Sequence, residues 1–169
     1  MLKFASGYVR VVDGFNHYVG RVIMYGIFAL MAVLVWSVIA KQAFTIPPFW
    51  TLEVAQFILV AYYLLGGAYS IQLGANVRMD LFYNEWSPRR KAQVDAITVL
   101  MLIFYLGVML YGGVDSVQYA VKYQEHSPSI WRPLMWPIKT VMCFGIFMML
   151  LQAISELIKD IATITGKHI

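Results

Sequence analysis

Glu53 is the acidic residue of this sequence best placed to do chemistry inside an apolar segment, because no residue from Val54 to Val77 is charged. A carboxyl group buried in such a segment can carry a coupling proton or make a polar contact with another subunit. An acid in the first turn of a helix is also favoured simply by the helix dipole. The sequence leaves these roles of Glu53 open.

The other residue types that commonly do chemistry are not spaced for it. His17, His126 and His168 all lie outside the long apolar segments, so they are not placed to hold haem inside a helix bundle. We find no His/Cys/Asp/Glu spacing typical of metal sites, no phosphate-binding GxxxxGK[ST] motif and no plausible Ser–His–Asp set. Cys143 is the only cysteine and cannot form an internal disulfide. We therefore expect neither an enzyme nor a bound cofactor.

The composition indicates the medium that surrounds these residues. Of 169 residues, 60% are apolar and 13% are charged, and the mean hydropathy is +0.67. Soluble domains have about 45–50% apolar and about 25% charged residues. The composition therefore predicts an integral membrane protein. The net charge of +4 is interleaved with apolar runs, which favours contact with phospholipids and not with nucleic acid.

Gaps between the charged residues predict the transmembrane helices. Uncharged segments cover residues 22–40, 54–77, 96–114 and 140–155. A helix needs roughly 20 mostly apolar residues to cross the hydrocarbon layer. The runs do not alternate as β-barrel strands do. We predict an all-α membrane fold, with one domain over residues 1–169 and four spans at about 20–41, 52–75, 93–115 and 136–158.

The distribution of lysine and arginine predicts the orientation. If both termini lie on one side of the membrane, that side receives nine basic residues and the other side four. The side with the excess is normally cytoplasmic. We therefore expect cytoplasmic termini, with an N-terminal segment that is retained.

Two amphipathic segments are expected at the membrane surface. In residues 1–19, apolar side chains at positions 4, 8, 11, 12, 15 and 19 share one helical face, and Lys3, Arg10, Asp13 and His17 share the other. This pattern suits an interfacial helix or a helix that docks on a partner. Residues 76–86 alternate apolar and charged residues, and Ser87-Pro88 predicts a helix start at Pro88.

Small residues recur on one face of the second predicted span, at Gly66, Ser70 and Gly74. Small residues let membrane helices approach closely. This face can serve packing within the chain or contact with a partner protein.

An ordered set of motifs resembles the small membrane subunit of tripartite ATP-independent periplasmic (TRAP) transporters, the DctQ-like Q subunit. The motifs are WTLE (50–53), LGGA (65–68), NVRMDL (76–81), SPRR (87–90), SIWRPLMWPIK (129–139) and LLQAISEL (150–157). The resemblance extends from about residue 20 to residue 160.

The resemblance implies a supporting role in the bacterial inner membrane. In this family a large multi-span membrane (M) subunit carries the substrate and sodium sites, and a periplasmic substrate-binding (P) protein captures an organic acid. The small subunit is expected to brace the large one without a substrate site of its own, and the coupling sodium is expected in the large subunit. The alternative is a small proton-coupled exporter that acts as a homodimer, with Glu53 as the coupling acid.

Within this interpretation we assign candidate roles to three sets of residues. Candidates for subunit contact or loop ordering are Glu53, Gly66, Ser70, Gly74, Arg78 and Asp80. Candidates for contact with lipid or a partner are Arg89, Arg90, Trp131, Arg132, Trp136 and Lys139. Candidates for contact with the periplasmic protein are Lys122, Glu125 and His126.

Overall fold

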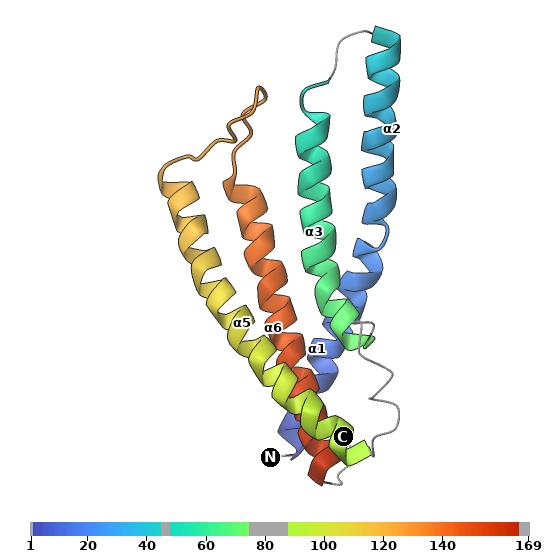
Figure 1. The fold of residues 1–169 in the computed structure, drawn as a ribbon, viewed down its shortest axis with the longest axis vertical. Coiled ribbons are helices and arrows are strands. Elements are labelled where there is room, and N and C mark those ends of the chain that lie inside the picture. The colour runs from blue at the N-terminus through green and yellow to red at the C-terminus, as the bar shows by residue number, and fades with distance from the viewer. Residues whose placement is uncertain (1, 45–47, 75–87, 166–169) are drawn as a thin grey trace.

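A computed structural model describes residues 2–44, 48–74 and 88–165 (Figure 1). The helices are α1 (Leu2–Ile23), α2 (Gly26–Phe44), α3 (Thr51–Gln72), α5 (Pro88–Lys122) and α6 (Trp136–Thr165). Four segments are long and apolar enough to cross a membrane, namely Ser6–Ala43, Thr51–Gln72, Gln93–Lys122 and Trp136–Ile164. The predicted all-α fold with four membrane-spanning segments is confirmed.

Helix α6 lies at the centre of the arrangement, where it packs against α5, α3 and α1. The core cluster forms between α5 and α6 around Leu106, Ile146 and Ala153. Partly buried apolar side chains from α3, α5 and α6 surround it. Helix α2 packs mainly along α3 and stands at the edge of the molecule (Figure 1). Within each helix the backbone N–H and C=O groups form hydrogen bonds with each other, as they must in a segment that crosses lipid.

The first predicted span is divided by a tight turn at Met24–Tyr25. The Tyr25 amide donates to the Val22 carbonyl at 3.2 Å, and the Phe28 amide donates to the Tyr25 carbonyl at 3.0 Å. The 19 residues of α2 span about 28 Å at 1.5 Å per residue, which is close to the thickness of the hydrocarbon layer. The turn therefore separates a helix of membrane length from α1, which packs against α3 and crosses α6 near the end of the molecule that holds the chain termini (Figure 1).

The faces of α1 differ from those that we predicted from the sequence. Asp13 and His17, which we assigned to a polar outer face, contact α6 and α3. Val11 and Phe15, which we assigned to the apolar face together with Val12, are exposed, whereas Val12 is buried. Helix α1 therefore buries a mixed face against its own chain and leaves an apolar strip exposed. Its location at the membrane interface stays a prediction.

The structure also shows where α3 ends and where α5 begins. Helix α5 begins at Pro88, as Ser87-Pro88 predicted. Helix α3 ends at Gln72, and Gly74 follows it with φ +60°, a conformation that glycine adopts without strain. The second amphipathic segment (76–86), together with Arg78 and Asp80, lies outside the described residues.

A short hairpin joins α5 to α6 at the end of the molecule opposite the chain termini (Figure 1). The Ser127 amide donates to the Pro133 carbonyl and the Met135 amide donates to the Glu125 carbonyl, both at 2.9 Å. Residue 126 pairs with residue 134 in an antiparallel β-bridge. The hairpin therefore forms an ordered cap beside the start of α3.

Candidate functional site

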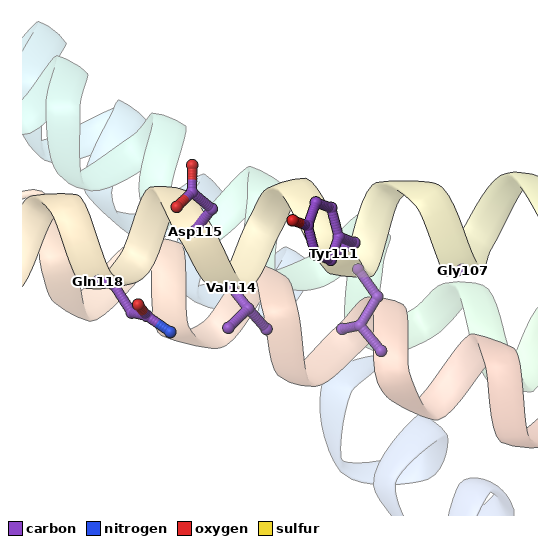
Figure 2. Close-up of a pocket in the computed structure, with 6 residues that line it drawn as sticks. Gly107, Tyr111, Val114, Asp115 and Gln118 are labelled. Carbon is purple, nitrogen blue, oxygen red and sulfur yellow. The ribbon is translucent and has the colours of Figure 1, made fainter.

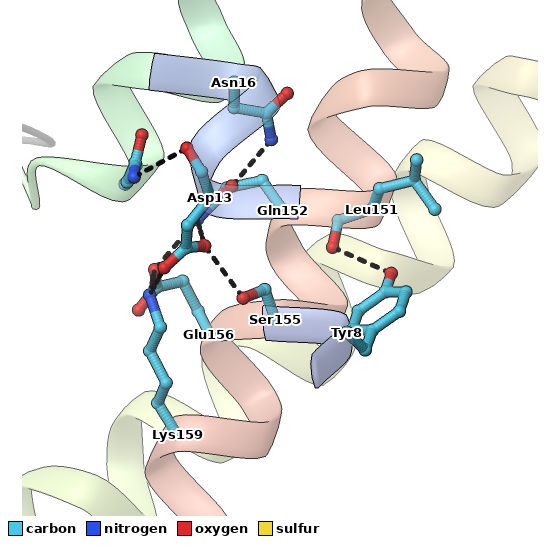
Figure 3. A network of polar contacts seen from close by, with 9 residues as sticks. Tyr8, Asp13, Asn16, Leu151, Gln152, Ser155, Glu156 and Lys159 are labelled. Carbon is cyan, nitrogen blue, oxygen red and sulfur yellow. Dashed lines mark hydrogen bonds and ion pairs between the residues drawn. The ribbon is translucent and has the colours of Figure 1, made fainter. Parts of the chain in front are cut away.

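A buried polar network joins α1 to the C-terminal half of α6 (Figure 3). The Asp13 carboxylate accepts hydrogen bonds from Gln152 Nε2 and Ser155 Oγ, each at 3.0 Å. Lys159 Nζ lies 2.7 Å from Asp13 Oδ2 and 2.8 Å from Glu156 Oε1. The ammonium of Lys159 is therefore shared by two carboxylates on two helices.

Two amides complete the contact between the helices. Asn16 Nδ2 donates to Gln152 Oε1 at 2.6 Å, and Gln152 Nε2 also donates to Glu156 Oε1 at 3.0 Å. The Gln152 and Ser155 side chains are fully buried, and Asn16 is 2% exposed. A polar group buried without a partner would cost about 1–3 kcal/mol, so this network specifies one way of docking α1.

Helix α3 joins the same region through Gln72. Its Nε2 donates to the backbone carbonyl of Asp13 at 3.1 Å. On the other side of α1, Tyr8 Oη donates to the Leu151 carbonyl at 3.2 Å. Hydrogen bonds among α1, α3 and α6 thus connect the three helices at the end of the bundle that holds the chain termini.

The opposite end of α3 contains Glu53. The residue is 8% exposed, and its carboxylate oxygen Oε1 accepts a hydrogen bond from Ser127 Oγ of the hairpin at 3.4 Å. Next to it, Thr51 Oγ1 donates to the Pro48 carbonyl at 2.8 Å and lies 2.9 Å from Ser37 Oγ of α2. Glu53 therefore lies where α2, α3 and the hairpin meet.

An ion pair that the sequence did not predict joins the hairpin to α6. Lys139 Nζ lies 2.5 Å from Glu125 Oε2. We had assigned Lys139 to lipid or partner contact and Glu125 to the periplasmic protein, but the structure pairs them with each other. The pair fastens the start of α6 to the hairpin and leaves both charges partly exposed.

One comparison with known proteins decides the family of this chain. Residues 30–163 match the model of the family described as "Tripartite ATP-independent periplasmic transporters, DctQ component". The match covers most of the chain and includes α3, α5 and nearly all of α6.

The chain belongs to the DctQ family. It is therefore the small permease subunit of a TRAP transporter, a multi-pass membrane protein and not an enzyme. No curated protein matches the chain. Within the described ranges, no group of three or more His, Cys, Asp or Glu side chains could hold a metal ion.

The remaining residues that we predicted for the outer side of this DctQ subunit lie on its surface. Lys122, at the end of α5, has its ammonium 5.5 Å from the centre of the Tyr123 ring. His126, Trp131, Arg132 and Trp136 are exposed on and beside the hairpin. The structure does not bring these residues into one site, and their contacts with lipid or a partner stay predictions.

Arg90 is exposed near the start of α5. Arg89 belongs to the same helical turn, and the structure describes its backbone only. Their contact with lipid or a partner also stays a prediction.

The predicted small-residue face of α3 is used in part for packing within the chain. A Cβ atom on Gly66 would lie 3.9 Å from Ile23 of α1, so this position makes ordinary contact. Ser70 lines a cavity beside α1, and Gly74 lies beyond the helix end. Helix α3 also approaches α6 closely at Gly145, where an added Cβ would lie 2.8 Å from Leu64 Cβ and 2.9 Å from the Leu64 backbone carbon.

The DctQ chain exposes long apolar faces on α2 and α5. On α5, Phe104 is 75% exposed and Tyr111 is 82% exposed. Figure 2 shows Tyr111 and Asp115 along one side of α5, and Val114 and Gln118 along another. Together with Gly107 and Leu110 they line a shallow depression. Apolar faces of this extent suit lipid or the surface of another membrane protein.

Proposed function

We propose that this DctQ chain is a static scaffold in a sodium-coupled TRAP transporter for organic acids. It braces the large membrane subunit, which holds the substrate and sodium sites, while a periplasmic protein delivers the substrate. The complex is placed in the bacterial inner membrane, with both termini of this chain in the cytoplasm. The excess of lysine and arginine on the side of the termini supports this orientation.

The observation that carries the proposal is the distribution of buried polar side chains along the bundle. Among the described residues they are Asn16, Gln152 and Ser155 near the end with the termini, and Thr51 and Glu53 in the first turn of α3. The core between them consists of apolar residues such as Leu106 and Ile146. A carrier that moves ions by itself needs polar or ionisable groups near mid-depth, so this distribution supports a role without a transport path.

The polar contacts at the end of the bundle that holds the chain termini support a rigid scaffold. Asp13, Gln152 and Lys159 connect α1 to α6 through contacts of 2.7–3.0 Å, and Gln72 adds α3. A helix held in this way keeps its neighbours at a fixed angle. A rigid support is what a moving partner subunit requires.

Neutralising Glu53 separates the scaffold from the alternative of a proton-coupled exporter. In cells that express all three transporter components, Glu53→Gln is expected to leave sodium-driven uptake within about twofold of wild type, because an isosteric amide keeps the Ser127 contact and no coupling proton is lost. The measurement is initial uptake of radiolabelled organic acids, with membrane abundance matched by immunoblot. Complete loss of uptake at normal abundance would contradict the proposal.

A further inference from the structure

A cavity opens beside Glu53 at the outer end of α2 and α3. It is lined by the end of α2, the start of α3 and the hairpin residues 127–130. Its volume of about 770 Å³ is in the range of small-molecule sites. The cavity is distinct from the buried network at the other end of the bundle.

One oxygen of the buried Glu53 carboxylate has no hydrogen-bond partner. Oε1 accepts from Ser127, whereas Oε2 is buried and unpaired. Burying a carboxylate oxygen without a hydrogen-bond donor costs free energy, so a ligand that donates a hydrogen bond to it is favoured. Glu53 is one of the residues that line the cavity.

The same cavity holds a charge of the opposite sign. Lys41, in the last turn of α2, lines it and forms no ion pair within the described part of the chain. Lys41 and Glu53 therefore present a cation and a carboxylate, not paired with each other, to one space. An occupant that carries an anionic group and an N–H donor would satisfy both.

The rest of the cavity wall is mixed: Ser37, Thr51, Gln56, Ser127 and Ser129 are polar, whereas its exposed edge includes large apolar side chains. Val38 of α2, Leu52 of α3 and Ile130 of the hairpin are all exposed. Val38 and Leu52 belong to helices that continue into the predicted membrane layer. The site is thus polar at one end and open to hydrocarbon along its sides, which fits an amphiphile better than a soluble ion.

We propose that this cavity binds the headgroup of a phospholipid with a primary amine, such as phosphatidylethanolamine, in the outer leaflet. The ammonium of the headgroup donates to the Glu53 carboxylate, and the phosphate lies against Lys41. The acyl chains follow Val38 and Leu52 into the membrane. A choline headgroup has the same charges but no N–H donor, so it cannot make the bond to Glu53.

Native mass spectrometry of the full chain tests the proposal. The chain is released from micelles that contain equimolar phosphatidylethanolamine, phosphatidylcholine and phosphatidylglycerol with identical acyl chains. The ammonium of ethanolamine makes a charge-assisted hydrogen bond that choline cannot make, so about fivefold preference for ethanolamine over choline is expected at this partly exposed site. Glu53→Gln is expected to reduce this preference below about twofold, since the amide loses the charge that strengthens the bond.

Two further variants keep the test decisive. Lys41→Gln, at an exposed position, is expected to lower the occupancy of both phosphatidylethanolamine and phosphatidylcholine, because both have the phosphate. Asp115→Asn removes an exposed carboxylate of α5 outside the cavity and is expected to leave the preference unchanged.

Several results would overturn the proposal. They are equal binding of the ethanolamine and choline lipids by wild type, an unchanged preference in Glu53→Gln, or unchanged occupancy in Lys41→Gln. If Glu53→Gln instead weakens co-purification with the large subunit and leaves lipid preference intact, the cavity accepts a protein side chain and the lipid proposal is wrong.

Discussion

Replacing Asp13 by alanine is expected to destabilise the isolated chain by about 2–3 kcal/mol, because three donors lose their shared acceptor. Ser155 is fully buried and loses its acceptor, whereas Gln152 Nε2 and Lys159 Nζ each keep a contact with Glu156, at 3.0 Å and 2.8 Å. For a chain of this size that loss corresponds to a fall in the thermal midpoint of about 5–10 °C. Thermal unfolding in detergent, followed by circular dichroism, measures it.

Matched variants give this prediction its control. Asp13→Asn keeps one acceptor oxygen but loses the ion pair with Lys159, so an intermediate midpoint is expected. Asp115→Ala removes an exposed carboxylate from α5 and is expected to leave the midpoint unchanged. Equal midpoints for Asp13→Ala and Asp115→Ala would show that the network does not hold α1 in place.

Adding a methyl group at Gly145 is the second change with a large expected effect. The new Cβ would lie 2.8 Å from Leu64 Cβ and 2.9 Å from the Leu64 backbone carbon, where α6 crosses α3. Backbone cannot move aside as a flexible side chain can, so Gly145→Ala is expected to cost about 1–3 kcal/mol. The measurement is again the thermal midpoint of the chain in detergent.

Alanine substitutions at two other glycines distinguish the effect of steric crowding from a general effect of replacing glycine by alanine in a helix. At Gly67 the added Cβ would meet the flexible Met149 side chain, with its sulfur at 2.6 Å, so a smaller loss is expected. At Gly107 it would meet nothing within 4 Å, so no loss is expected. If Gly145→Ala were as stable as Gly107→Ala, α3 and α6 would not approach as closely as described.

Charge spacing was enough to predict the helices but not their contacts. The uncharged runs, the Ser87-Pro88 pair and the start at Trp136 reflect local rules of polarity and helix capping, so they could be predicted from the sequence. The turn at Met24–Tyr25 could not, because no proline or charge marks it. Its position depends on where α1 docks.

The polar network was missed because helical periodicity cannot tell which of two faces meets the rest of the chain. Asp13 was placed with Lys3 and Arg10 on an outer face, yet it pairs with Lys159, far away in the sequence. Buried asparagine and glutamine give a weak signal that could have helped. Asn16 lies one turn after Asp13, and Gln152 and Ser155 lie on one side of α6.

At the end of the bundle opposite the chain termini, the apolar surroundings of Glu53 could be predicted from the sequence, but its contacts could not. The hairpin returns Ser127 to Glu53, and it pairs Glu125 with Lys139. Both arrangements depend on the conformation of residues 123–135, which proline and serine content predicts only as a loop.

The most direct test of the scaffold role is transport by the wild-type chain alone in proteoliposomes. One assay follows uptake of radiolabelled organic acids under a sodium gradient, and a second follows export of ethidium under a proton gradient. The complete three-component system is the positive control for uptake. We predict that the chain alone matches empty liposomes in both assays. Uptake or export above that background, abolished by Glu53→Gln, would contradict the account and favour the exporter.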